Sequence, residues 1–265
     1  MALTVHGTYV AKKIDELSDG KTLHILDMGC GKGNVIEGLL PKGHAMYGYD
    51  FENRRTAASE RLRPYYQENF DNYIKFVDDE RKIPFADQQF DLIYAIQVFE
   101  HVRFLDSMLA ECARVLKPSG KLIMTFPLAT APIEQHVNIP FVQWLPPGNF
   151  RVRYLHLWYW LRLRPRLNKM SPYEMAVSRD NFLRNQTYYR FLNEYLSVGA
   201  YFFSRFEIDT QTTLRTKLAL VADQGVPWKR SLAQWLLNMD DRSFNTLASM
   251  VSHFVNITLI FCDPQ

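Results

Sequence analysis

Cysteine is scarce in this sequence, and long runs of purely apolar residues are absent. The three cysteines, Cys30, Cys112 and Cys262, form no CxxC or Cys/His pattern, which excludes a disulfide framework and a zinc-finger type of site. Residues 243–262 carry no Asp, Glu, Lys or Arg, but Ser, Asn, Thr and His interrupt them throughout. We therefore expect a helix that leads into a strand there, and not a membrane span.

A large charge surplus is also missing. The chain has 31 Lys and Arg against 28 Asp and Glu, a net charge of +3, which is too small for its overall field to favour nucleic acid. Hydrophobic residues make up 47% and charged residues 22% of 265 positions, which excludes disorder and fits one large α/β domain or a domain with an insertion. The first residues lack signal-peptide features, and with the scarce cysteines we expect a cytoplasmic protein.

Short apolar runs alternate with helical patterns through the first half of the chain. The apolar runs predict strands at residues 23–28, 45–49, 74–77, 90–96 and 121–126. Helical periodicity predicts helices at residues 5–17, 35–40, 54–69 and 104–116, and we expect Pro118 and Gly120 to end the last of these. Strands that alternate with helices at this spacing predict a doubly wound, parallel α/β sheet covered on both faces.

This alternation stops after Pro127. Residues 128–178 contain several prolines and aromatic residues without a clear period, so we interpret residues 128–200 as an insertion or cap. Residues 201–265 are expected to complete the sheet. Strands are predicted in this last part at 205–209 and 256–262 and a helical segment at 231–254, and another helical segment is predicted before it at 180–196.

A glycine loop follows the first predicted strand. Asp27, Gly29, Gly31 and Gly33 lie at the carboxyl end of that strand, where open α/β sheets bind their ligands. Glycine lets the backbone approach a ligand and turn sharply into a helix. The spacing differs by one residue from a dinucleotide fingerprint and lacks the phosphate-loop pattern. A tight turn without a ligand is the competing interpretation.

Acidic residues follow the next two strands. Asp50 ends the second strand, where a carboxylate can accept hydrogen bonds from ribose hydroxyls, although a helix N-cap is an equal alternative. Asp79 follows the third strand. Because parallel strands end at one edge of a sheet, these residues and the glycine loop together predict a crevice suited to a nucleoside.

Several motifs occur in a fixed order between about residues 20 and 127. They are Asp27-x-Gly29-Cys30-Gly31-x-Gly33, Asp50, Asp79 with Ile83-Pro84-Phe85, Phe90-Asp91-Leu92-Ile93, Glu100-His101-Val102 and Arg114-Val115-Leu116-Lys117-Pro118-x-Gly120. As a set they resemble the class I S-adenosylmethionine-dependent methyltransferases of the broad small-molecule type. The resemblance implies a Rossmann-like, seven-stranded, mostly parallel sheet whose last strand is antiparallel.

The resemblance also implies S-adenosylmethionine as the cofactor and S-adenosylhomocysteine as its product. The glycine loop would contact the amino acid and ribose end, where Asp27 suits an ammonium group. The other residues implied to bind the cofactor are Asp50 for the ribose hydroxyls, Phe51 next to it, Asp79 with the backbone at Glu80 for the adenine, and Gln97 for the methionine moiety. For Glu100 and His101, which precede the following helix, we favour capping and packing over catalysis.

Methyl transfer from a sulfonium is an in-line displacement, so positioning supplies most of the catalysis. A hydroxyl acceptor benefits from a general base, for which His136 and His101 are the candidates. His136 follows the fifth strand, where acceptors bind in related enzymes, and Glu134 could orient its ring. A structural role is the competing interpretation for His136, and more so for His101.

Missing motifs exclude some classes of methyl acceptor. No Asn-Pro-Pro-Tyr type motif follows the fourth strand and no cysteine follows a proline, so we expect no DNA substrate. Asp240 and Asp241 form an isolated pair that fits a helix N-terminus, so no metal is expected.

Aromatic and basic side chains concentrate in residues 141–170. Three of the five tryptophans lie there, and residues 151–170 carry six basic side chains and no acidic one. This segment could be a lid helix packed on the core, an acceptor pocket, or a contact with an anionic membrane surface.

We therefore predict a methyltransferase for a small molecule, glycan or lipid-linked intermediate, acting on oxygen, with residues 128–200 as the acceptor lid. A non-catalytic cofactor-binding or partner subunit, with a membrane or protein docking segment, is the alternative. Oligomeric state is left open.

Overall fold

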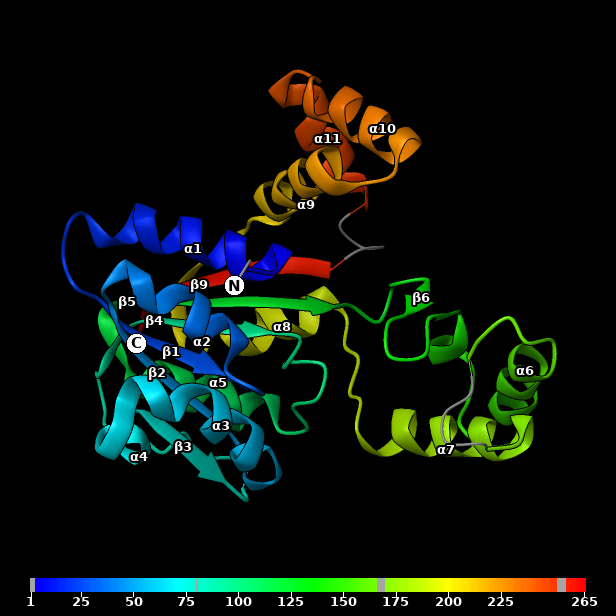
Figure 1. Cartoon of the computed structure of the whole chain (residues 1–265), viewed down its shortest axis with the longest axis horizontal. Coiled ribbons are helices and arrows are strands. Elements are labelled where there is room, and N and C mark those ends of the chain that lie inside the picture. Colours follow the sequence, from blue (N-terminus) through cyan, green and yellow to red (C-terminus); the bar gives the residue numbers. More distant parts are fainter. Residues whose placement is uncertain (1–2, 80, 166–169, 252–255) are drawn as a thin grey trace.

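A seven-stranded sheet forms the centre of the computed structural model, which describes residues 3–79, 81–165, 170–251 and 256–265 (Figure 1). The strand order is β3-β2-β1-β4-β5-β9-β8. The strands are β1 (His24–Met28), β2 (Ala45–Phe51), β3 (Ile74–Val77), β4 (Phe90–Ile96), β5 (Leu116–Pro127), β8 (Phe203–Ile208) and β9 (Asn256–Pro264). The first five are parallel, and β9 is antiparallel to both of its neighbours. The predicted sheet is confirmed.

Helices cover both faces of this sheet. Alternate residues of the central strands point to opposite faces, so Ile25 packs in one hydrophobic cluster and Leu26 in the other. The first cluster joins the sheet to α1 (Val5–Ser18), α2 (Asn34–Leu39), α3 (Arg55–Tyr66) and α4 (Phe70–Tyr73). The second cluster joins it to α5 (Leu105–Val115) and α8 (Leu192–Gly199). Buried apolar residues on both faces explain why these strands read as continuous apolar runs.

The start of β5 differs from the prediction. Helix α5 ends at Val115, and the strand begins at once with Leu116, five residues before its expected start. Leu116 pairs with Phe90 and Lys121 with Leu92. Between these two pairs, β5 advances by five residues whereas β4 advances by two. Pro118 and Gly120 therefore lie in a bulge inside the strand, and they do not end the helix.

The insertion lies beyond the end of β5 (Figure 1) and has its own hydrophobic cluster. It contains the hairpin of β6 (Ile133–Glu134) and β7 (Ile139–Pro140), followed by α6 (Asn149–Trp160) and α7 (Pro172–Asn185). A capping box between Ser171 and Glu174 begins α7. Within the predicted range 128–200, α8 packs instead beneath the sheet against α5.

Helix α6, which carries part of the aromatic and basic residues of segment 141–170, packs on α7 through Leu155 and Tyr159. Arg151 is buried and bonds Asp180 of α7 at 2.6 Å between Nε and Oδ1. Phe150 and Trp160 are exposed. The aromatic side chains of this segment are therefore divided between the packing of the insertion and its surface.

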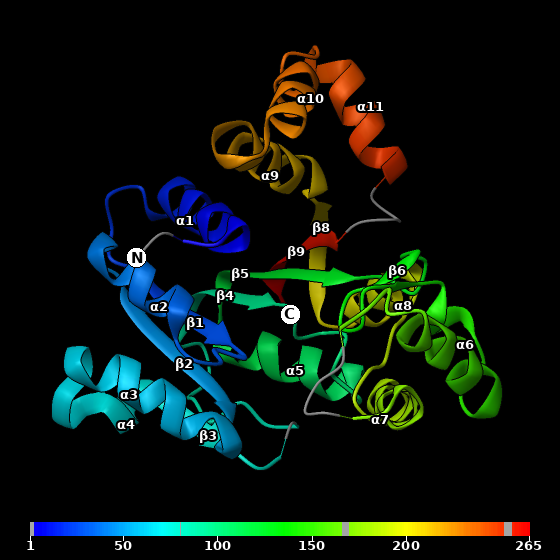
Figure 2. The same cartoon turned by 45° about the vertical axis from the view of Figure 1, so that its right-hand side comes forward.

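Three helices project from the sheet between β8 and β9 (Figure 2). They are α9 (Thr210–Gln224), α10 (Pro227–Leu237) and α11 (Asp241–Val251). The sequence did not predict α9, because only Thr210 and Thr213 of this helix are buried and it has no continuous apolar face. Residues 252–254 of the predicted segment 231–254 lie outside the described residues. Within the described parts of the chain, every helix is too short or too polar to cross a bilayer.

Candidate functional site

The glycine loop is a sharp turn held in place by β2. Gly29, Gly31 and Gly33 have φ angles of 73°, 55° and 76°, a region that other residues rarely adopt. The N–H groups of Gly29 and Cys30 donate to the Tyr49 carbonyl at 2.9 and 3.1 Å. A Cβ atom on Gly29 would lie 2.5 Å from Cγ2 of Val98. The loop therefore needs glycine for its backbone and for its close contact with the turn after β4.

Asp50 lies at the end of β2 beside this loop. Its carboxylate accepts the N–H of Gly31 at 2.6 Å and that of Phe51 at 2.7 Å. The N-cap of α3 is Arg54, which excludes the helix-cap interpretation of Asp50 for that helix. A pocket of mostly apolar character opens here at the carboxyl ends of β1, β2 and β3. Its lining residues are Met28, Gly29, Tyr49, Asp50, Phe51, Val77, Val98, His101, Val102 and Met108.

Asp27 lies on the central strand β1, and Gln97 directly follows the neighbouring strand β4. Asp27 is 4% exposed and pairs in register with Tyr94 of β4. Burial raises the pKa of Asp27 well above its usual value. Gln97 follows β4 with a φ of 56°, and its N–H donates to the Thr125 carbonyl at 2.8 Å. A glutamine held in the left-handed region is a strained residue of the type that accumulates at binding sites.

Asp79 lies after β3 and is exposed. Hydrogen bonds from the Arg81 guanidinium and from the Arg81 N–H lower the pKa of Asp79 to about 2. It borders a second, wider pocket together with Lys75, Val77 and Phe85. Val77 lines both pockets, so Asp79 is at the outer side of the same sheet edge. Glu80 lies outside the described residues.

The structure brings both predicted catalytic histidines together. The Nε2 atoms of His101 and His136 are 3.1 Å apart. Nδ1 of His101 lies 2.5 Å from the carbonyl oxygen of Gln186, at the end of α7. Nδ1 of His136 lies 2.6 Å from Oε1 of Glu134, which also accepts the Tyr189 hydroxyl. The expected contact between Glu134 and His136 is thus present, and we call these two histidines with Glu100, Glu134 and Tyr189 the histidine cluster.

Burial affects the titration of this cluster. Burial acts to raise the pKa of Glu134, but the bonds from His136 and Tyr189 outweigh it and hold that pKa below its usual range. Burial lowers the pKa of His101. These shifts favour an ionised Glu134 beside a His136 that donates through Nδ1, and a neutral His101.

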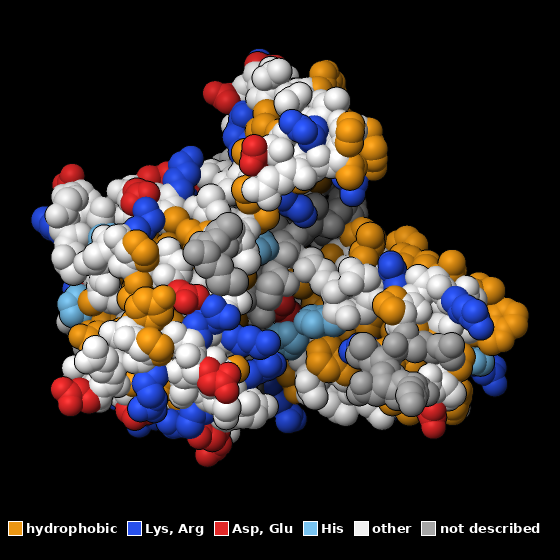
Figure 3. Space-filling model, viewed as in Figure 1, with side chains coloured by type: hydrophobic (Ala, Val, Ile, Leu, Met, Phe, Trp, Pro, Cys, Tyr) orange, Lys and Arg blue, Asp and Glu red, His pale blue; other side chains and the backbone are white. Residues whose placement is uncertain are grey.

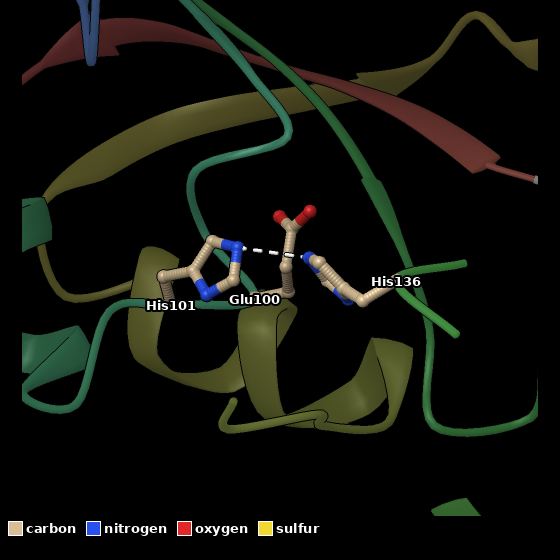
Figure 4. Close-up of side chains that lie close together, drawn as sticks. All are labelled: Glu100, His101 and His136. Atoms are coloured by element: carbon tan, nitrogen blue, oxygen red, sulfur yellow. Dashed lines mark hydrogen bonds between the residues drawn. The ribbon is translucent and has the colours of Figure 1, made fainter. Parts of the chain in front are cut away.

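Glu100 completes the cluster, and the capping role expected for Glu100 and His101 is wrong. Helix α5 begins at Leu105 with Phe104 as its N-cap and no side-chain cap bond, so neither Glu100 nor His101 caps it. Glu100 is fully buried, and neither carboxylate oxygen has a hydrogen-bond partner among the described residues. Burial raises the pKa of Glu100 to about 7. Figure 4 shows its carboxylate beside the line that joins the two imidazole rings.

The cluster lies where the sheet domain meets the insertion. Glu100 and His101 come from the turn after β4, whereas His136 comes from the turn between β6 and β7. Histidine side chains are visible at this junction beside a group of lysine and arginine side chains (Figure 3). The sequence missed the carbonyl of Gln186 and the hydroxyl of Tyr189, since both reach the cluster from the connection between α7 and α8, about fifty residues after His136.

Comparison with known proteins relates part of the chain to methyltransferases and agrees with the fold. A family model described as a methyltransferase domain matches residues 26–124. The sterol 4-C-methyltransferase strm-1 of Caenorhabditis elegans is 34% identical over 118 residues, which are 44% of this chain and 34% of that protein. A ubiquinone biosynthesis O-methyltransferase of Coxiella burnetii is 29% identical over 114 residues, which are 43% of this chain and 47% of that protein.

One solved structure extends the similarity of fold to nearly the whole chain. It is the geranyl diphosphate C-methyltransferase of Streptomyces coelicolor A3(2), in complex with Mg²⁺, geranyl diphosphate and S-adenosyl-L-homocysteine. The two structures align over 97% of this chain and 80% of that chain, at 13% sequence identity. The TM-score is 0.50. The chain spans between a third and a half of the length of the two curated relatives. Residues 26–124 belong to the family of class I methyltransferases that use S-adenosylmethionine as their cofactor.

Proposed function

We propose that this chain binds S-adenosylmethionine at the carboxyl edge of β1, β2 and β3 and transfers its methyl group to a small-molecule or lipid-linked acceptor. The observation that supports this most strongly is one pocket that combines Gly29, Asp50 and Phe51 with His101 of the histidine cluster. The pocket thus joins residues suited to a nucleoside with residues suited to proton transfer. Family membership of residues 26–124 supports the same cofactor.

In this proposal, Asp50 binds the ribose hydroxyls while keeping the glycine loop in place. Its carboxylate already accepts two backbone N–H groups, at Gly31 and Phe51, and a carboxylate has lone pairs for further donors. The buried Asp27 suits the ammonium group of the methionine moiety, because that pair of charges would compensate its burial. Asp79 and Glu80 bind the adenine at the outer side of the edge, and Gln97 faces the methionine moiety.

The transfer is an in-line displacement on the methyl carbon. A lone pair of the acceptor forms the new bond to this carbon, the carbon–sulfur bond breaks, and its electron pair stays on the sulfur of S-adenosylhomocysteine. For a hydroxyl acceptor, the proton leaves the oxygen for the histidine pair His101 and His136. Glu134 stabilises the positive charge that His136 then carries, since its carboxylate lies 2.6 Å from Nδ1.

We propose oxygen as the acceptor atom because this cluster offers a base, which a neutral amine acceptor does not need. The acceptor enters between the sheet domain and the insertion, where the turn between β6 and β7 meets the turn after β4. Exposed aromatic residues of the insertion, Phe150 and Trp160 among them, suit an extended apolar acceptor. The names of the two curated relatives include sterol and ubiquinone biosynthesis, which supports a lipid-like class.

The test is a methyl-transfer assay with a panel of hydroxylated sterols, polyprenylated phenols and simple phenols. We expect wild-type protein to release S-adenosylhomocysteine with at least one acceptor, whose product gains one methyl group on oxygen by mass spectrometry and NMR. His136→Gln should lower kcat by about 10²–10⁴-fold and leave the affinity for S-adenosylhomocysteine within a factor of about two. His156→Gln, elsewhere in the insertion, is the matched control and should keep full activity. A product methylated on carbon or nitrogen would refute the choice of oxygen.

A further inference from the structure

The Nε2 atoms of the two histidines in the cluster face each other, and both are acceptors when the rings are neutral. Nδ1 of His101 contacts a backbone carbonyl, which can only accept, so this nitrogen carries the hydrogen. Nδ1 of His136 contacts Oε1 of Glu134, whose carboxylate also accepts the Tyr189 hydroxyl and the Val137 N–H. This nitrogen therefore also carries a hydrogen. In two neutral rings, both Nε2 lone pairs then meet at 3.1 Å, which requires a cation between them.

The separation of these nitrogens fits a shared metal ion. Imidazole nitrogens that bind Zn²⁺ lie about 2.0–2.1 Å from it, which places two of them about 2.9 Å apart at a right angle and about 3.3 Å apart in a tetrahedron. The observed 3.1 Å between His101 and His136 falls between these values. A carboxylate oxygen of Glu100 completes a set of three ligand atoms that all lie within 4.8 Å of one another.

The surroundings of the three side chains have the form of a metal site. A histidine that binds metal generally donates its other N–H to a carbonyl or a carboxylate, and His101 and His136 do so to Gln186 and Glu134. Glu100 is fully buried with two oxygens that lack partners among the described residues. Such a group is costly to bury unless something compensates it, and a cation between two histidines would.

We propose that Glu100, His101 and His136 form a binding site for one divalent transition metal ion of the Zn²⁺ type. Two histidines and one glutamate make a donor set that leaves coordination positions open. This site departs from the sequence analysis, which expected no metal, because the ligands come from segments 35 residues apart that only the folded insertion brings together. Because His101 also lines the pocket at the glycine loop, an open position of the bound metal would hold the acceptor oxygen and favour loss of its proton in place of the histidine pair, whose Nε2 lone pairs are then occupied. This role rests on the proposed function.

A proton shared between the two Nε2 atoms is the competing explanation of the short distance. It would need one positive charge on the pair, with Glu100 as a nearby counter-ion, and it predicts no metal affinity. The two explanations therefore predict different affinities of the cluster for Zn²⁺. This affinity can be measured whether or not the chain methylates any acceptor.

The experiment titrates chelator-treated, dialysed full-length protein with Zn²⁺ alone in a weakly coordinating buffer, by calorimetry. We expect saturable binding of one ion at this site, and visible d–d absorption when Co²⁺ replaces Zn²⁺. His136→Ala should abolish this binding, and Glu134→Gln should weaken it by about 10–100-fold through loss of the partner of Nδ1. His156→Ala is the matched control and should bind as the wild type does.

No saturable Zn²⁺ binding by the wild type overturns the metal site without any variant having to fold. Binding that His136→Ala leaves unchanged also overturns it, provided that near-ultraviolet circular dichroism shows a folded variant. Titration of the same samples with S-adenosylhomocysteine separates the two proposals. Cofactor binding without Zn²⁺ binding refutes only the metal site, and Zn²⁺ binding without cofactor binding refutes only the proposed function.

Discussion

Replacement of Gly29 by alanine tests whether the glycine loop is fixed by sterics as the structure indicates. At a φ of 73°, a residue with a Cβ atom costs about 1–2 kcal/mol more than glycine. The new Cβ atom would also lie 2.5 Å from Cγ2 of Val98, far inside the contact distance of about 3.5–4.0 Å between carbon atoms. Relief of such a contact costs about 1–3 kcal/mol. We expect Gly29→Ala to lower the free energy of unfolding by about 2–5 kcal/mol.

A second substitution separates the two costs. Val98→Ala removes the methyl groups that the new Cβ atom meets, so the double variant Gly29→Ala/Val98→Ala keeps only the backbone cost. Its destabilisation should be smaller than the sum of the single variants by about 1–3 kcal/mol, because residues in contact are not additive. Gly43→Ala is the matched control, since Gly43 has a φ of 78° and no atom within 4 Å of the position of a Cβ.

Urea unfolding followed by circular dichroism measures these differences through the midpoint at constant m value. Gly43→Ala should cost only the backbone strain, about 1–2 kcal/mol. A Gly29→Ala variant as stable as Gly43→Ala would refute the steric argument. Strict additivity of the double variant would refute the contact with Val98.

Two further predictions concern stability elsewhere in the chain. Asp180→Ala should lower the free energy of unfolding by about 3–5 kcal/mol, because it leaves the Arg151 guanidinium buried without its partner at 2.6 Å. Thermal unfolding measures this, and a loss below about 1 kcal/mol would contradict it. Hydrogen bonds from Arg114 hold the pKa of Glu111 below its usual value. Glu111 therefore contributes stability above its unfolded pKa of about 4.3 and loses it as the pH falls through the lower folded pKa. The stability difference between wild type and Glu111→Gln should accordingly shrink on acidification below about pH 4, and a difference that stays constant in urea titrations would contradict this.

The sheet could be predicted because its signals are local. The buried strand at residues 90–96 was found to the residue, since a strand covered on both faces must be continuously apolar. The location of Asp50 and Gly29 at one edge of the sheet could be predicted for a related reason, because the carboxyl ends of parallel strands meet at one edge. These positions depend on the strand order and on little else.

The remaining features depend on contacts between distant segments. The bulge in β5 is visible only in the pairing of Leu116 and Lys121 with β4, so Pro118 and Gly120 carried a misleading helix-end signal. The histidine cluster required the insertion to fold back onto the turn after β4. Only that arrangement gives Glu100 its place beside both rings (Figure 4), which is why a cap was expected there.

Calorimetric titration with S-adenosylhomocysteine tests the proposed cofactor site most directly. We expect the wild-type chain to bind one molecule with a dissociation constant of about 10 μM or below. Asp50→Ala should weaken this binding at least 100-fold, because each hydrogen bond to a charged group contributes about 1.5–3 kcal/mol, while Asp71→Ala, at an exposed carboxylate of similar kind, should bind normally. Absence of heat with the wild type, or equal affinity of Asp50→Ala and Asp71→Ala, would contradict a nucleoside site at this edge of the sheet.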